Sequence, residues 1–376
     1  MDPLIERLAG AQAEHVHREL EALVAVSSPS GDHEGAEAAV ALCGSFLPPA
    51  ASLQRVPCST AACSPDLVGR LRGSGARRLL LLGHIDTVIA HGDHLPLRAR
   101  DGRLLGPGTV DMKGGVVLAL AVARCLATIP ERFAEVAVLL VCDEEWRVAD
   151  FAHVDRFAGF DACLCFEAGE RTRAGEDGVI VRRKGAGTLR VEARGRAAHS
   201  GSAPQDGRNA LLALSRAAIE IAAVADPEGP AHLTVVPTVM RSGEAFNVVP
   251  AAGELIFDMR STDVSAFARA RAAVPAEIDG VTLEARMERV WPAMDTEDAT
   301  AELLSEGSRR LGRAIVPRAR GGASDASHFA TVIPLTVDGL GPRGGGAHTP
   351  DEFIWADSLR QRLEVALALT LAVLDG

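Results

Sequence analysis

Four short apolar runs, each followed by acidic or imidazole side chains, most constrain how this chain can fold. The runs are LLLLG (79–83), VAVLLVC (136–142), ACLCF (162–166) and IPLTV (333–337). Segments with apolar residues at helical spacing alternate with them, such as 113–130. A strand that is apolar throughout is covered on both faces, and its alternation with helices is typical of a parallel sheet. We therefore expect an α/β fold with a mostly parallel sheet and helices on both faces.

The pattern changes near residue 180, which indicates a second domain. Residues 179–201 and 281–290 alternate apolar and polar side chains, as strands with one solvent-facing side do. Helices are predicted within 202–225 and 263–273, and after residue 292 the first pattern resumes. We predict one domain made of residues 1–180 and 293–376, interrupted by a smaller α+β domain at 181–292.

Composition and charge narrow the function classes. The chain has 376 residues, of which 47% are hydrophobic and 24% charged, and its net charge of -11 includes no basic block that would favour nucleic acid. Its seven cysteines form no disulfide ladder, and the pair Cys58 and Cys63 has no second pair to complete a zinc knuckle. No apolar run is long enough to span a bilayer. We expect a cytoplasmic protein with neither a nucleic-acid nor a membrane partner.

Ligands of doubly wound sheets bind beyond the carboxyl ends of the parallel strands. In this sequence, the imidazole and carboxylate side chains that follow the apolar runs or precede the buried helix are His84, Asp86, Asp111, Asp143, Glu144, Glu145, Glu167, Asp338 and His348. One such loop would carry no information, but every loop at this edge has an imidazole or a carboxylate. We expect these side chains to converge.

Converging carboxylates repel one another unless protons or metal ions neutralise them. Imidazole and carboxylate without thiolate suit zinc, or cobalt or manganese in the same geometry. Two histidines and three acids are too many for one catalytic zinc, but they fit two zincs that share a carboxylate. With a bridging hydroxide the charges sum to zero, and such a hydroxide is a nucleophile at neutral pH. The extra acid of the Glu144–Glu145 pair can accept its proton.

Seven motifs in fixed order carry a family resemblance. They are HIDTV (84–88), GPGTVDMKGG (106–115), DEE (143–145), FEAG (166–169), RAAHSG (196–201), GGASD (321–325) and GGGAHTPDE (344–352). The chain resembles the M20 family of di-zinc metallopeptidases and aminoacylases, with the closest likeness to the glutamate carboxypeptidase branch. Each motif alone is weak, but the ordered set spans nearly the whole chain. The resemblance implies a zinc exopeptidase-like fold in which the insert is a lid and dimerisation domain.

The resemblance also implies a ligand set. His84, Asp111 and Glu167 would surround one zinc, and Asp111, Glu145 and His348 the other, so that Asp111 bridges the two. The cofactors would be two Zn²⁺ per subunit, with Co²⁺ or Mn²⁺ as possible substitutes. In the family the peptide bond after the bridging aspartate is often cis.

Further roles follow from the same resemblance. Glu144 would be the general base, and Asp86 would orient the ring of His84. His199 would stabilise the oxyanion, either within its own chain or across a dimer. Asn247 and Arg260 would bind substrate, although Arg260 has an alternative as a strand charge paired with Asp258 or Asp263.

The implied activity is hydrolysis of an amide bond in small N-acyl amino acids, dipeptides or glutamyl conjugates that carry a free carboxylate, by a homodimer joined through the lid. The alternative is a biosynthetic deacylase of the acetylornithine or succinyl-diaminopimelate type, which these motifs do not separate from the first. A serine hydrolase is disfavoured because the chain has no G-x-S-x-G elbow. His91, His94 and His328 receive no role. Asp325 is expected to have a structural role near the site or to cap a helix, and Asp338 to be solvated or to cap a helix.

Overall fold

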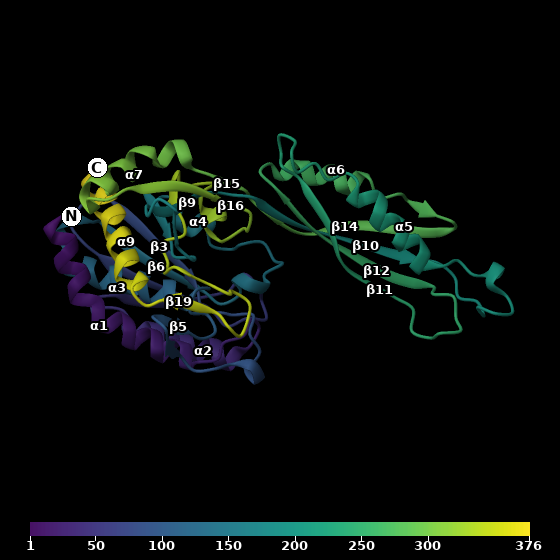
Figure 1. Cartoon of the computed structure of the whole chain (residues 1–376), viewed down its shortest axis with the longest axis horizontal. Coiled ribbons are helices and arrows are strands. Elements are labelled where there is room, and N and C mark those ends of the chain that lie inside the picture. Colours follow the sequence, from purple (N-terminus) through teal and green to yellow (C-terminus); the bar gives the residue numbers. More distant parts are fainter. The chain divides into compact units, whose positions relative to one another are not determined.

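The four apolar runs form the centre of the larger of two units into which the chain divides. The computed structural model describes all residues, 1–376. The first unit comprises Met1–Arg182, Asp295–Ala319 and Ser324–Gly376, and the second comprises Arg183–Met294 with Arg320–Ala323 (Figure 1). Each unit has a hydrophobic core of its own.

A six-stranded sheet organises the first unit, in the order β1-β2-β6-β3-β7-β17. Its strands are β1 Ser52–Val56, β2 Asp66–Arg72, β3 Arg78–His84, β6 Glu135–Val141, β7 Ala162–Cys165 and β17 Leu335–Val337. The pairs β6–β3, β3–β7 and β7–β17 are parallel, whereas β1–β2 and β2–β6 are antiparallel. The mostly parallel sheet predicted from the apolar runs is therefore confirmed.

Helices pack on this sheet and on one another. They are α1 Pro3–Ala25, α2 His33–Phe46, α3 Lys113–Leu126, α4 Val154–Phe157, α7 Glu297–Leu311, α8 Ala326–Phe329 and α9 Ser358–Asp375. The α3 helix packs on β3 and β6 and also contacts α1 and α9, while α8 packs on β7 and β17. Because all but one residue of α3 is buried, its sequence is apolar on every side. No helix is long and apolar enough to cross a membrane.

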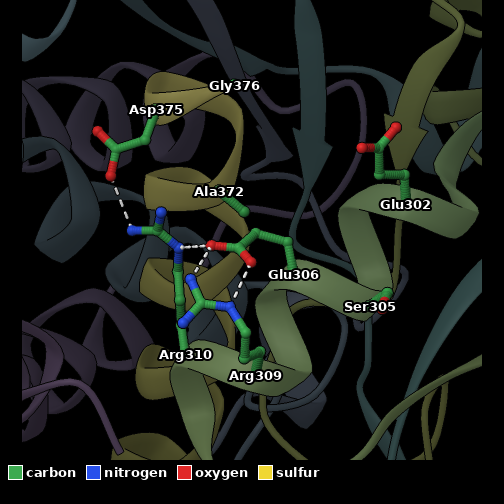
Figure 2. A pocket seen from close by; sticks show the side chains of 8 residues that line it. All are labelled: Glu302, Ser305, Glu306, Arg309, Arg310, Ala372, Asp375 and Gly376. Atoms are coloured by element: carbon green, nitrogen blue, oxygen red, sulfur yellow. Dashed lines mark hydrogen bonds and ion pairs between the residues drawn. The ribbon is translucent and has the colours of Figure 1, made fainter.

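Ion pairs join the exposed sides of α7 and α9 (Figure 2). Glu306 accepts hydrogen bonds from Arg309 Nε at 2.7 Å and from Arg310 Nε at 2.6 Å, which lower the pKa of its carboxyl to about 2. Arg310 Nη1 also donates to Asp375 Oδ2, at 2.8 Å, near the end of α9. Glu306, Arg309, Arg310 and Asp375 are thus paired with one another, which indicates a structural role for this network.

Smaller sheets and turns complete the first unit and the segments that lead out of it. The sheet β18-β19-β5-β4 and the sheet β15-β9-β16, to which β8 adds, lie outside the six-stranded sheet. Their strands are β4 Arg98–Arg100, β5 Arg103–Leu105, β8 Glu170–Arg171, β9 Asp177–Arg183, β15 Met294–Asp295, β16 Ile315–Arg320, β18 Gly344–Gly345 and β19 Phe353–Trp355. The 3₁₀ turns here are η1 His91–Asp93, η2 Pro130–Arg132 and η3 Glu144–Trp146.

The second unit is an antiparallel sheet in the order β11-β12-β10-β14-β13, with two helices. Its elements are β10 Gly185–Arg194, η4 Pro204–Asp206, α5 Ala210–Ala222, β11 Thr234–Ser242, β12 Ala252–Ser261, η5 Val264–Ala266, α6 Phe267–Ala272, β13 Glu277–Ile278 and β14 Val281–Trp291. The α5 helix packs on β10, β11 and β12. Arg190 pairs with Glu254 and Glu288 on neighbouring strands, as expected of a solvent-facing side.

Some elements differ from the sequence-based expectation. The strands β1 and β2 were not predicted, because β1 exposes four of its five residues and β2 carries charged residues within its apolar pattern. The helix expected within 202–225 begins only at Ala210, because Asn209 Oδ1 accepts the N–H of Leu212 and caps it there.

Truncating the central strand should cost far more stability than truncating an edge strand. Leu81 in β3 is fully buried, so Leu81→Ala should lower the free energy of unfolding by about 2–5 kcal/mol through lost burial and a cavity. Leu53 in β1 is 53% exposed, and Leu53→Ala should change the free energy of unfolding by less than about 0.5 kcal/mol. Urea denaturation followed by circular dichroism measures both; equal losses would contradict this architecture.

Candidate metal centre

The carboxyl ends of three parallel strands bring the predicted side chains together. His84 is the last residue of β3, Glu144 and Glu145 form η3 just after β6, and Glu167 follows β7. Asp111 lies directly before α3, and the loop between β18 and β19 contributes His348. This is the edge at which open α/β sheets bind ligands.

Asp111 lies between two groups of side chains, with one oxygen toward each. Its Oδ1 is 3.2 Å from His84 Nε2, which is in turn 3.7 Å from Glu167 Oε1. Its Oδ2 is 3.2 Å from His348 Nε2, which is 3.1 Å from Glu145 Oε2. Within each group the candidate ligand atoms lie within 4.8 Å of one another. The structure thus brings together all five predicted ligands in the two sets that the resemblance implied.

These distances and donors fit two cations. Metal–ligand bonds of about 2.0–2.2 Å in a tetrahedron place neighbouring ligand atoms about 3.3–3.6 Å apart, close to the separations observed. Glu145 Oε1 is buried without a hydrogen-bond partner, as expected of an oxygen that lacks its cation. Imidazole nitrogen and carboxylate oxygen are donors that zinc, cobalt and manganese accept. The chain therefore has two candidate metal-binding groups that share Asp111.

Burial and hydrogen bonds shift the pKa values of the side chains in this cluster. Burial raises the pKa of Glu144 to about 7, and burial and repulsion from Asp111 raise that of Glu167 well above its usual range. Hydrogen bonds to Asp111 and Glu145 raise the pKa of His348 to about 10. Burial opposes the charged form of His84, yet its hydrogen bonds to Asp111 and Asp86 raise its pKa well above normal.

Asp86 anchors more of the site than the sequence indicated. Its Oδ1 lies 3.3 Å from His84 Nδ1, consistent with the predicted orientation of that ring. The same carboxylate accepts the backbone N–H groups of Glu144 and Glu145, each at 3.1 Å, and the hydroxyl of Ser30 at 2.5 Å. One buried aspartate therefore orients a candidate ligand and also holds the turn that carries two further acids.

Glu352 is a residue that sequence reasoning missed. It is buried and accepts the backbone N–H groups of Gly108 and Val110, each at 2.7 Å, and of Asp111 at 2.9 Å. These bonds orient the loop before α3, in which the Asp111–Met112 peptide bond is cis, as the resemblance implied. The only feature of the sequence that could have indicated Glu352 is its position in the same motif as His348.

Two predicted residues of the second unit are neighbours on its surface. His199 Nδ1 accepts the N–H groups of Gly201 at 3.1 Å and Ser202 at 3.2 Å. In the neutral ring the proton is therefore on Nε2, which leaves a donor directed away from its own loop. Ser200 donates its N–H to the backbone oxygen of Asn247 at 3.0 Å, and both His199 and Asn247 are exposed.

Arg260 is engaged within its own strand. Its Nε and Nη2 donate to the two carboxylate oxygens of Asp258, both at 2.9 Å. The pairing with Asp258 considered from the sequence is thus present, and a substrate carboxylate would have to compete with it.

The remaining acids and histidines have structural contacts. Asp325 pairs with Arg147 and makes no side-chain cap on α8, so its role is structural. Asp338 is buried and accepts a hydrogen bond from the Ser324 hydroxyl at 2.6 Å. The predicted solvated or capping role of Asp338 is therefore wrong. His91 and His94 bond to Ser27 Oγ and Val24 O, each at 2.8 Å. His328 stacks on Phe151 with ring centroids 4.9 Å apart, and burial lowers its pKa to about 3.

Removing the Asp86 carboxylate should weaken metal binding. We expect Asp86→Ala to lower the affinity for Zn²⁺ about 10–100-fold, because the ring of His84 and the η3 turn lose their anchor. Competition with a chromophoric chelator measures the affinity. Asp93→Ala, at an exposed residue of η1, is the control and should bind as the unmodified chain does. Unchanged affinity in Asp86→Ala would contradict the anchoring role.

The metal-free protein should lose stability as pH rises. The raised pKa of His348 stabilises the folded state fully below about pH 6.5, and this contribution is lost as pH rises toward about 10. For Glu144 the loss falls between about pH 4.5 and about 7. With chelator present, the melting temperature should therefore be lower at pH 9 than at pH 6. Added Zn²⁺ should remove most of this difference, because the metal replaces the protons. If the melting temperature changed equally with pH with and without Zn²⁺, these side chains would not be metal ligands.

Sequence comparison shows which known proteins this chain resembles. Residues 80–372 match the model of the family described as Peptidase family M20/M25/M40. The chain is 26% identical to carboxypeptidase G2 of Pseudomonas sp. (strain RS-16), over 98% of this chain and 92% of that protein. It is 27% identical to succinyl-diaminopimelate desuccinylase of Stenotrophomonas maltophilia (strain R551-3), over 78% of this chain and 83% of that protein.

Solved structures share the fold. A tripeptidase from Staphylococcus aureus subsp. aureus Mu50 has a TM-score of 0.78 at 18% identity, covering 97% of this chain and 99% of its own. The dipeptidase Dug1p of Saccharomyces cerevisiae has a TM-score of 0.74 at 12% identity, covering 99% of this chain and 98% of its own. Since the family match spans most of the chain and includes every candidate ligand, the protein belongs to peptidase family M20/M25/M40 and is a metallo-hydrolase.

Proposed function

We propose that this metallo-hydrolase uses two zinc ions to cleave an amide bond in small N-acyl amino acids, dipeptides or glutamyl conjugates. The observation that carries the proposal is the placement of Asp111, whose two oxygens each face one imidazole and one further carboxylate. His84 and Glu167 would hold one ion, and Glu145 and His348 the other. Bound zinc would polarise the scissile carbonyl and lower the pKa of the attacking water.

Glu144 is the proposed general base. It directly precedes the candidate ligand Glu145 in η3, and Asp86 holds the backbone of this turn close to His84. A glutamate carboxylate at this position can accept a proton from water and then give it to the leaving amine. Its backbone N–H is held by Asp86, which keeps the side chain at this edge of the sheet.

The second unit is proposed to bind substrate and to join two chains into a homodimer. The His199 Nε2–H is a suitable donor for an oxyanion, because backbone N–H groups occupy Nδ1. Asn247, beside His199 on the same surface, would contact the substrate. Arg260 would exchange its bond to Asp258 for a substrate carboxylate, for which a guanidinium fork is well shaped.

We also propose a cytoplasmic location. All seven cysteines are free thiols in the structure, which fits a reducing compartment.

A product-release assay tests the substrate class. Carboxypeptidase G2 matches nearly the whole chain, so we expect release of a free C-terminal amino acid from acyl or pteroyl glutamate conjugates and dipeptides. Release of succinate or acetate from succinyl-diaminopimelate or acetylornithine would instead establish the alternative deacylase. A panel of these substrates with zinc-loaded protein, analysed by mass spectrometry, distinguishes the two. No turnover of any member would contradict both.

Removing the base should abolish turnover without removing the metal. Glu144→Gln keeps the shape but cannot accept a proton, so kcat should fall at least about 10²–10⁴-fold while zinc content stays unchanged. Glu131→Gln, on exposed η2, is the matched control and should retain full activity. Steady-state kinetics and elemental analysis are read together. Full activity in Glu144→Gln would exclude the proposed mechanism.

A further inference from the structure

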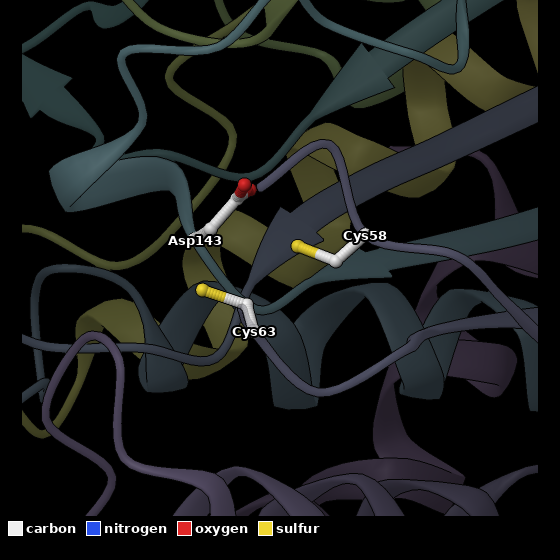
Figure 3. Close-up of side chains that lie close together, drawn as sticks. All are labelled: Cys58, Cys63 and Asp143. Carbon is white, nitrogen blue, oxygen red and sulfur yellow. The ribbon is translucent and has the colours of Figure 1, made fainter. Parts of the chain in front are cut away.

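A further group of side chains that could hold a metal ion shares no residue with the centre around Asp111. Cys58 and Cys63 are on the loop 57–65 between β1 and β2, and Asp143 follows β6 (Figure 3). Their two sulfurs and the carboxylate lie within 4.8 Å of one another. They are also the two cysteines that retain partial exposure, whereas the other five are buried. As a ligand group, Cys63 is partly exposed, whereas Cys58 and Asp143 are buried.

The Asp143 carboxylate is already oriented as a ligand would be. Its Oδ2 accepts the backbone N–H of Thr60 at 2.9 Å, which holds the cysteine loop against it. Its Oδ1 accepts Nη1 of buried Arg147 at 2.8 Å. Carboxylates that ligate metals are commonly held by such outer hydrogen bonds.

The geometry suits a tetrahedral ion with sulfur ligands. Bonds of about 2.3 Å to sulfur and about 2.0–2.2 Å to oxygen place the ligand atoms about 3.3–3.8 Å apart, within the observed limit. Three protein ligands leave a fourth position for water. Two thiolates and one carboxylate favour Zn²⁺ over Mg²⁺ or Ca²⁺, which prefer oxygen ligands.

Two further features describe the surroundings of these three side chains. The Thr60 hydroxyl is buried without a hydrogen-bond partner, although its backbone contacts Asp143. Burial, together with the negative charges of Asp66 and Asp143, raises the pKa of the Cys58 thiol well above its usual range. A bound cation would offset these negative charges and favour the thiolate form.

We propose that Cys58, Cys63 and Asp143 form a zinc-binding site separate from the centre around Asp111. On binding, the two thiols lose their protons to solvent and both sulfurs bond to the ion. The ion would tie the loop 57–65 to the residue that directly precedes Glu144 and Glu145. Its role would be to position that turn, since none of the three side chains is assigned to the reaction. The proposal is independent of the substrate and mechanism proposed above.

Cobalt substitution tests sulfur ligation directly. Thiolate bound to Co²⁺ gives a near-ultraviolet charge-transfer band that imidazole and carboxylate ligands cannot produce. Reduced, metal-stripped protein titrated with Co²⁺ should show this band, and His84→Ala, which alters only the other centre, should retain it. Absence of the band in the unmodified chain would overturn the proposal.

Variants then assign the band to these cysteines. The double variant Cys58→Ser/Cys63→Ser should lose the band and bind about one equivalent of zinc less than the unmodified chain. Ala62→Ser adds a hydroxyl to the same loop at an exposed position and should keep both. A double variant with unchanged zinc content and unchanged band would also overturn the site.

Thiol labelling provides a test that needs no variant. Zn²⁺ should slow alkylation of Cys58 and Cys63 at least about tenfold, because a coordinated thiolate is protected from the reagent. Peptide mass spectrometry reads the two positions separately from the five buried cysteines. Equal labelling with and without Zn²⁺, or a Cys58–Cys63 disulfide under reducing conditions, would contradict metal binding.

Discussion

Repulsion among carboxylates crowded at one edge of the sheet is the constraint on which the rest of this structure depends. Asp86, Asp111, Glu145 and Glu167 lie close to the imidazoles of His84 and His348. Such a cluster is stabilised by compensating positive charge, which the raised pKa values of His84 and His348 favour and which, as we propose, metal ions supply. The scaffold must therefore resist the tendency of these loops to separate.

Two buried acids, Asp86 and Glu352, supply that resistance. Asp86 gathers the N–H groups of Glu144 and Glu145, and Glu352 gathers three N–H groups around Asp111. Both therefore fix backbone and not only side chains, which is what a site with tight ligand distances requires. The parallel strands provide the rigid base, because their buried residues are packed on both faces.

Much of this arrangement could be predicted from local patterns. A continuous apolar run predicts a buried parallel strand, and the residues that follow it lie at the edge of the sheet. The sequence alone therefore predicts that His84, Glu145 and Glu167 lie close together. The pairing of Arg260 with Asp258 was foreseen only as an alternative, because strand neighbours two residues apart share a face and a substrate-free side chain takes whichever partner is near. The edge strand β1 has four exposed residues out of five, so its sequence lacks the apolar pattern from which a strand can be predicted.

The sequence by itself determined the α/β fold, the chemical types of the ligands and the family of hydrolases to which the chain belongs, because strand periodicity and ordered motifs are local properties. Only the tertiary structure decided which oxygen of Asp111 faces which imidazole, that Glu352 holds the Asp111 loop from 241 residues away, and that Cys58 and Cys63 meet Asp143. These contacts join segments far apart in the chain, and no local pattern records them. Their geometry follows from how the strands and loops pack.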